Sequence, residues 1–219
     1  MIVNQVRYQI TQEQGNQYVS NCLFIFFLQV ILSILVGLQI FSKDFEFTMG
    51  DYSVFISRFI CALMLHMRLE IEVRQSLNMI RYLINHSAQF TSTMVPFLVA
   101  HMQLFASLLT EIINICLICG QKTIMDSIIN FIALGAISEI DNYYAVSLNH
   151  LPIKKAAEEP YPFMKRLYYL RLSKMSCQQI LLRSIYKFYR VVYVSLYFYF
   201  TPYITTVFSY LAASNASKK

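Results

Sequence analysis

The strongest pattern along the chain is a series of long apolar runs separated by shorter polar stretches. Residues 22–41 and 191–213 contain no charged side chain, and each covers the roughly 20 residues that a helix needs to cross a bilayer. Both runs therefore predict transmembrane helices.

Three further apolar runs carry polar residues. Residues 94–119 and 123–144 are long enough to cross, and the short connection between them predicts an antiparallel helical hairpin. Residues 54–67 contain Arg58 and are short, so they fit either a crossing or a re-entrant or interfacial segment. Counting that run, we expect an all-α polytopic membrane protein, a single membrane domain over 1–219 with about five transmembrane helices.

Lys and Arg residues collect in 145–190, whereas 42–53 is mainly acidic. Inner loops of membrane proteins are enriched in Lys and Arg, so five crossings place 145–190 and 68–93 inside and 42–53 outside. This consistency favours counting 54–67 as a crossing.

Two stretches beside the apolar runs have amphipathic patterns with basic residues. We expect interfacial helices near 69–86 and 162–190 that lie on the anionic headgroup layer, with packing on a partner protein as the alternative. The expected contacts with anionic lipid are Lys154, Lys155, Lys165, Arg166, Arg171 and Lys174.

Glu111 is the carboxylate that lies deepest in an apolar run. At such a depth it must be protonated, paired or open to water, and Arg58, His101 and Asn114 are candidate partners. One interpretation is a cation or proton path; its candidate residues, with the possible counter-charge, are Glu111, Asp126, Asn130, His101 and Arg58. The alternative, which the sequence favours, is a buried polar cluster in which Arg58 neutralises Glu111.

Glu139 and Asp141 stand at the end of the run 123–144. We expect this acidic pair to cap the helix or to pair with the basic segment 154–171. Helical spacing puts Asp126, Asn130 and Asp141 on one face, but Ala133 and Ile137 interrupt that face at mid-depth, which weakens a pore hypothesis.

The stretches 59–90 and 108–145 resemble a group of polytopic membrane proteins found in ciliate genomes. The residues that carry the resemblance are His66, Asn85, His86, Glu111, Asn130, Ala133, Leu134, Glu139, Ile140 and Asp141. Some members of that group have channel-like names and most have none. The resemblance therefore implies lineage and membrane topology more firmly than an activity.

Composition agrees with a membrane protein, because 57% of the residues are hydrophobic, 14% are charged and the mean hydropathy is +0.47. The five cysteines are scattered, and no phosphate-binding loop, nucleophile elbow or zinc-protease motif is present. We therefore expect no enzyme activity, no cofactor and no metal. The net charge of +6 lies mainly beside the apolar runs, which indicates anionic lipid rather than nucleic acid.

Two hypotheses about function remain. The first, slightly favoured, is a non-catalytic membrane subunit of a larger assembly, such as a mitochondrial respiratory or ATP synthase complex. The second is a subunit of a cation or proton channel or transporter, whose path is lined by polar groups on 94–119 and 123–144. In either case the partners are lipids and other membrane subunits or copies of the same chain, and the mitochondrial inner membrane and the plasma or internal membranes remain alternatives.

Overall fold

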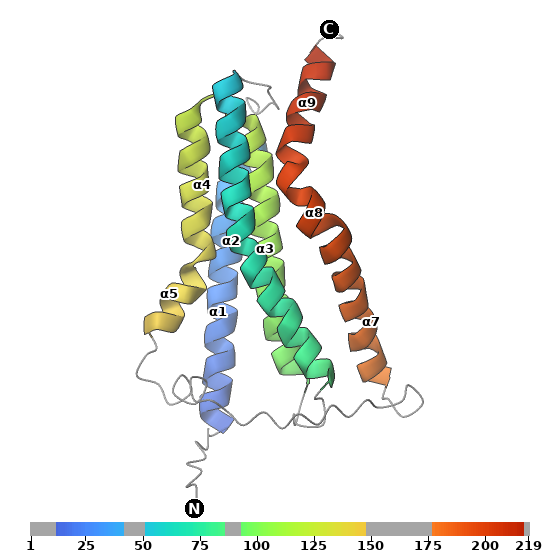
Figure 1. Cartoon of the computed structure of the whole chain (residues 1–219). Helices are drawn as coiled ribbons and strands as arrows, with labels where there is room; N and C mark the ends of the chain where they lie inside the picture. Colours follow the sequence, from blue (N-terminus) through green and yellow to red (C-terminus); the bar gives the residue numbers. More distant parts are fainter. Residues whose placement is uncertain (1–11, 42–50, 86–92, 148–176, 217–219) are drawn as a thin grey trace, which may run out of the picture.

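The computed structural model describes residues 12–41, 51–85, 93–147 and 177–216. In these ranges the chain is all-α, as the sequence predicts. The elements in chain order are α1 (Gln12–Gly37) with a 3₁₀ turn (Leu38–Phe41), α2 (Tyr52–Asn85), α3 (Met94–Gly120), α4 (Ile124–Ser138), α5 (Ile140–Ser147), α7 (Cys177–Val192), a π-helical segment (Tyr193–Tyr197), α8 (Phe198–Phe200), a second 3₁₀ turn (Thr201–Tyr203) and α9 (Ile204–Ala216). Helices α1 to α4 run alternately up and down a bundle, and the C-terminal segment climbs beside α2 and α3 (Figure 1).

The number of candidate crossings is smaller than the sequence predicts. Two helices, Asn16–Gly37 and Met94–Gly120, are long and apolar enough to cross a membrane. A third crossing results if Gln179–Phe200 and Ile204–Leu211, which meet at a bend of 63°, form one span. The prediction of about five transmembrane helices is therefore wrong, and two or three helices qualify within the described residues.

The difference arises at two of the predicted crossings, 54–67 and 123–144, neither of which forms a helix that is long and apolar enough to cross. The runs 54–67 and 69–86 are not a span followed by a separate helix, because α2 continues without a break and carries the charges of both. No Gly or Pro interrupts residues 52–85, so nothing in the backbone ends the helix between them. The run 123–144 divides into α4 and α5, which leaves an apolar helix of only 15 residues.

The predicted hairpin of α3 and α4 is confirmed. Helix α3 ends at Gly120, and α4 begins three residues after Gln121 and packs against α3. Thr123 is the N-cap of α4, and its Oγ1 accepts a hydrogen bond from the backbone N–H of Asp126 over 3.1 Å. The Thr123 hydroxyl donates in turn to the Asp126 carboxylate over 2.6 Å, so the two residues satisfy each other at the helix start.

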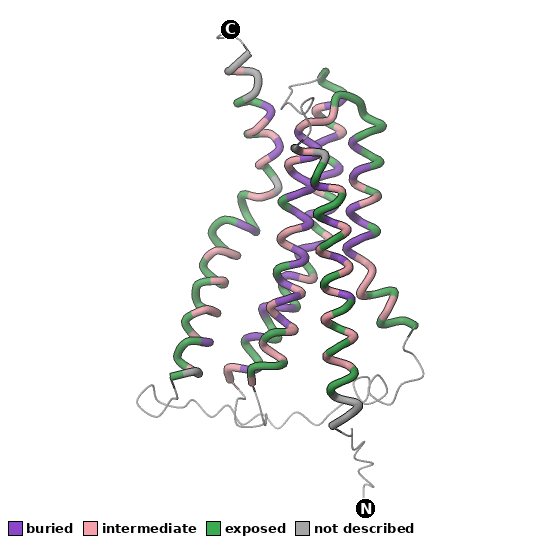
Figure 2. The backbone as a smooth tube through the Cα atoms, turned by 180° about the vertical axis from the view of Figure 1, so that it is seen from behind, coloured by how far each residue is buried: buried purple, intermediate pink, exposed green. Residues whose placement is uncertain are grey.

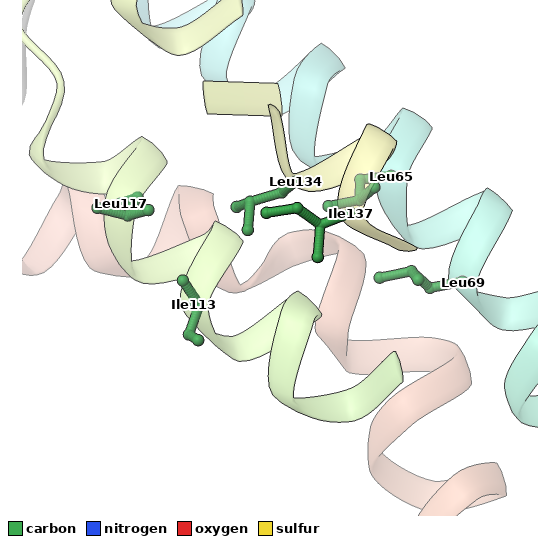
Figure 3. Close-up of a cluster of buried hydrophobic side chains, with 6 residues drawn as sticks. All are labelled: Leu65, Leu69, Ile113, Leu117, Leu134 and Ile137. Atoms are coloured by element: carbon green, nitrogen blue, oxygen red, sulfur yellow. The ribbon is translucent and has the colours of Figure 1, made fainter. Parts of the chain in front are cut away.

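The apolar core joins α2, α3 and α4 (Figure 3). It consists of Leu65, Leu69, Ile113, Leu117, Leu134 and Ile137. The apolar side of the amphipathic stretch near 69–86 faces the bundle, since Val73, Leu77 and Ile80 are buried. Figure 2 shows buried residues along the inner sides of the bundle and mostly exposed residues on the C-terminal segment.

Helix α1 joins the bundle through small and polar residues. Its buried positions recur every four residues, at Ile25, Gln29, Ser33 and Gly37. The Ser33 hydroxyl lies 3.2 Å from the Thr110 hydroxyl of α3, and a Cβ at position 37 would lie 3.3 Å from Ile113. Close backbone approach combined with interhelical hydrogen bonds is the way in which helices pack in membranes.

Candidate functional site

The most deeply buried ionisable contact joins α2 to α3. His66 Nδ1 lies 2.6 Å from Glu111 Oε1, and both side chains are less than one-tenth exposed. The other carboxylate oxygen of Glu111 and the Oδ1 atom of Asn114, one turn further along α3, are buried without a hydrogen-bond partner among the described residues. Unpaired polar atoms of this kind are rare in native interiors, so they make this contact a candidate functional site.

Three tyrosines of the C-terminal segment extend this contact along the bundle. Tyr197 packs over the His66 ring with centroids 5.0 Å apart, and Tyr193 donates a hydrogen bond to Glu70 of α2. Tyr189 lies 2.9 Å from His101 Nδ1 of α3. We call the set Tyr189, Tyr193, Tyr197, His101, Glu70, His66 and Glu111 the tyrosine seam.

The π-helical segment that holds Tyr193 and Tyr197 lies just before the bend of the C-terminal segment. A π-helical turn shifts the following residues round the helix axis and is common at functional sites. The bend follows at Thr201–Tyr203, where Pro202 supplies no backbone N–H to continue the α-helical hydrogen bonds. The two irregular turns allow Tyr197 and then Thr205 and Ser209 of α9 to be buried.

The structure pairs Arg58 and Glu111 with other groups than the sequence suggests. Arg58 is 1% exposed and donates to the carbonyl oxygen of Gln121, where α3 ends. His66, the partner of Glu111, follows Arg58 by eight residues, about 12 Å along α2. The predicted Arg58–Glu111 pair is thus replaced by two separate contacts. Both contacts join α2 to the C-terminal half of α3 or the turn after it.

The proposed polar path does not form a single cluster either. Asp126 is exposed at the start of α4, and Asn130 is buried one turn below it. His101 lies ten residues before Glu111, about 15 Å away along α3, and contacts Tyr189 instead. The candidate residues therefore lie at three different levels of the bundle.

Glu139 takes part in the break between α4 and α5. It is the C-cap residue of α4, and its carboxylate forms an ion pair with Arg68 of α2. Arg68 reaches it by passing over Gly135, where an added Cβ would lie 3.2 Å from the guanidinium. The predicted pairing with 154–171 lies outside the described residues, as do the six basic residues expected to contact lipid.

The other acidic residue, Asp141, lies in the first turn of α5 beside a capping side chain from α1. The amide of Gln29 donates to Asp141 Oδ1 over 3.2 Å and to the carbonyl oxygens of Ile137 and Ser138 over 3.4 and 3.3 Å. These carbonyls belong to the last turn of α4, where helices in general leave carbonyl groups without helical partners, and Gln29 donates to both. Burial raises the pKa of Asp141, although Gln29 and backbone N–H groups oppose that shift.

A second carboxyl group, Glu72 of α2, lies at the same level. Ser107 Oγ of α3 donates to Glu72 Oε2 over 2.8 Å, and Glu72 and Asp141 line the same small cavity. Burial raises the pKa of Glu72 to about 7, with Ser107 opposing the shift and the charge of Asp141 adding to it. Burial thus raises the pKa of both carboxyl groups, and a cation placed beside them would favour their charged form.

A much larger cavity of about 390 Å³ adjoins this acidic level. It lies between the middle of α1, the first half of α3 and α5, and its walls are mostly apolar. Three of its lining residues, Gln29, Gln103 and Asp141, also line the small cavity that contains Glu72. The site thus combines an apolar space with a polar, acidic end.

The sequence analysis did not single out His66, Glu70, Glu72 or the seam tyrosines as site residues. Except for Glu72, their signal is a spacing of four, at 189, 193 and 197 in the C-terminal segment and at 58, 62, 66 and 70 in α2. That spacing becomes visible only when 54–67 and 69–86 are treated as one helix.

No protein-family model matches the chain, and the searches of curated proteins and of solved structures give no match either. The resemblance to ciliate membrane proteins stays a prediction. Within the parts of the chain that the structure describes, His, Cys, Asp and Glu side chains form no group of three that could hold a metal ion.

Proposed function

We propose that this chain is an integral membrane protein that acts as a non-catalytic subunit of a larger membrane assembly. The outer side of α1 supports a membrane location, because Phe24, Phe27, Ile31 and Leu35 are each about half exposed or more. Only 17% of the residues in the most apolar stretch of α1 are buried within the chain. A water-soluble protein rarely leaves so continuous an apolar surface uncovered.

The observation that carries the proposal is the pairing of buried ionisable groups between helices. Arg58 meets the end of α3, His66 meets Glu111, and Glu70 meets Tyr193. Ionisable side chains in an apolar environment are stable only when they are paired, and pairs between helices hold a bundle together. The interior polar residues thus serve packing, which is the expected design of a structural subunit.

Helix α2 supports the involvement of partners. Its last three turns expose Arg74, Gln75, Asn78 and Arg81 on one side. This exposed polar surface offers a neighbouring subunit a place to bind.

The test is native gel separation of gently solubilised membranes, with protein identification in the band that contains this chain. We expect a band far larger than the 25.6 kDa chain, and Arg81→Glu to release the chain from it. Lys122→Glu, an exposed cation at the opposite end of the bundle, is the matched control and should leave the band intact. Migration of the unmodified protein as a monomer would contradict the proposal, whereas respiratory or ATP synthase subunits in the band would identify the assembly.

A second candidate function, proton transfer, is favoured by the tyrosine seam. Hydroxyl, imidazole and carboxyl groups recur along it from Tyr189 and His101 to Glu111. However, Val73, Leu77 and Leu104 pack around the seam tyrosines, and a relay needs continuous hydrogen bonds or water. This apolar packing is the reason for placing proton transfer second.

Flux measurements separate the two functions. Vesicles containing the purified assembly and a pH-sensitive dye would report proton movement under an imposed potential. If the seam conducts, Glu111→Gln abolishes the flux with the assembly intact, while Asp126→Asn leaves it unchanged. A structural role predicts no specific flux in any variant and a less stable assembly for Glu111→Gln.

A further inference from the structure

The cavity between α1, α3 and α5 exists because α5 turns away from the bundle. Helix α4 ends at Ser138, and the C-cap residue Glu139 is held by Arg68, so α5 leaves in a different direction (Figure 1). The diverging helix leaves a space of about 390 Å³ against α1 and α3. That volume is within the range of small-molecule sites, which begins at about 300 Å³.

The walls of the cavity favour an apolar chain or ring system. Ile25 and Phe26 of α1, Val99 and Met102 of α3, and Ala145 of α5 line it. Methionine and aromatic side chains adapt to flexible apolar ligands, and burial of each ligand CH₂ contributes about 0.8 kcal/mol. The cavity is also partly open, so a ligand has a route of entry.

The polar end of the cavity favours a positively charged headgroup. Asp141 lines it directly, and Glu72 lies in the small cavity that shares Gln29 and Gln103 with it. Arg68, the cation that acts on both carboxyl groups, already pairs with a third carboxylate, Glu139. Among the described residues, carboxyl groups therefore outnumber the cation at this level, an arrangement that favours a cation over an anion.

We propose that this cavity binds a single-chain amphiphile with a protonated amine headgroup. The amine lies at Asp141, and the chain extends between α1 and α3 along Phe26 and Met102. Burial, which raises the pKa of Asp141, agrees with a carboxyl group that lacks a full counter-charge until a cation arrives. The inference is independent of the assembly in which the chain resides, since every wall belongs to this chain.

Cys22 gives a direct readout of occupancy because it lines the cavity and is exposed. Cys177, an exposed cysteine at the start of α7, is the internal control. The purified full chain in detergent is treated with N-ethylmaleimide, and mass spectrometry gives the labelling rate at each cysteine. The probes are dodecylamine, dodecanol and dodecanoate, which share a chain and differ in the charge of the headgroup.

We expect dodecylamine to slow labelling of Cys22 on the order of tenfold, with little change at Cys177 and much weaker effects of the other two probes. Asp141→Asn, which keeps the oxygen that accepts from Gln29, should reduce the effect of the amine to that of dodecanol. Asp126→Asn should retain the full effect. Ala145→Phe, which fills the cavity, should abolish protection by the amine relative to the same variant without a probe.

Several results would overturn the proposal. Equal protection by all three probes would show simple partitioning of apolar chains, and equal slowing at Cys177 would show an effect on the micelle. Absence of protection by the amine, or full protection in Asp141→Asn with normal helical content, would remove the role of the carboxylate. Full protection in Ala145→Phe would place the ligand elsewhere.

Discussion

Replacement of Glu72 by Gln should stabilise the protein at neutral and alkaline pH and change little in acid. The carboxyl group has an ordinary pKa of 4.5 and a folded-state pKa of about 7, because burial disfavours its charged form. Gln has nearly the same size and can still accept the hydrogen bond from Ser107. The substitution therefore removes the titration while it keeps the shape.

The sign follows from proton binding in the two states. Below about pH 4.5 Glu72 is protonated whether the chain is folded or unfolded, so it contributes its full stability. Between about pH 4.5 and 7 the unfolded chain loses the proton while the folded chain keeps it, and the free energy of unfolding falls as pH rises. Above about pH 7 the loss is complete.

The magnitude follows from the size of the shift. One pKa unit corresponds to about 1.4 kcal/mol, so the shift from 4.5 to about 7 gives an upper limit of roughly 3 kcal/mol. We expect a difference of about 1 to 3 kcal/mol in favour of Gln at pH 8, since solvent reaches part of the side chain. For a chain of this size that difference raises the Tm by roughly 2–10 °C.

The assay is thermal unfolding of the full chain in detergent, followed by circular dichroism at pH 4.5 and at pH 8. The quantity of interest is the Tm difference between Glu72→Gln and the unmodified protein at each pH. Asp126→Asn is the control for a general effect of charge removal, because Asp126 is an exposed acidic residue in the first turn of α4. A Tm difference that is the same at both pH values, or a less stable Gln variant at pH 8, would refute the reasoning.

Three further substitutions test the packing. Gly37→Leu should lower the Tm, because even a Cβ would lie 3.3 Å from Ile113, and overpacking costs about 1–3 kcal/mol; Gly37→Ala should have a smaller effect in the same thermal scan. Leu134→Ala, at a fully buried core position, should cost about 2–5 kcal/mol by denaturant titration, and Ile132→Ala on the exposed side of α4 should cost far less. Thr123→Val should cost about 1 kcal/mol through loss of the N-cap hydrogen bond, and Thr123→Ser should retain it.

The all-α class, the α3–α4 hairpin and the amphipathic pattern of 69–86 could be predicted because each depends on local pattern. The packing of that stretch inside the bundle could not be predicted, since an amphipathic pattern fits a lipid surface equally well. A turn as short as 121–123 forces two helices to pack, and residues spaced by three and four must share a helix face. The number of apolar crossings could not be predicted in the same way. The hydropathy pattern of residues 54–86 predicts a span followed by a surface helix, because the first part is apolar and the second is charged. The structure instead has one continuous helix α2, since no Gly or Pro ends it between the two parts.

The partners of the buried charges were the least predictable part of the site. The expected depths of the two residues in the membrane suggested Arg58 as the partner of Glu111. The rotation and register of α2 against α3 instead place His66 beside Glu111 and Arg58 beside the Gln121 carbonyl. Such a choice depends on which turn of one helix faces which turn of another. One helical turn changes the level by about 5.4 Å, more than the length of a hydrogen bond.

By itself the sequence determined that this chain forms apolar helices, that its ionisable groups within them need partners, and that Glu139 stands at a helix end. These features follow from hydropathy, helical period and the energetic penalty of unpaired charge, which act locally. The tertiary structure alone decided that Gln29 caps α4, that Tyr197 covers His66, and that the turn of α5 leaves a cavity beside Asp141. Those features arise between segments far apart in the chain, and only the packing of the helices brings them together.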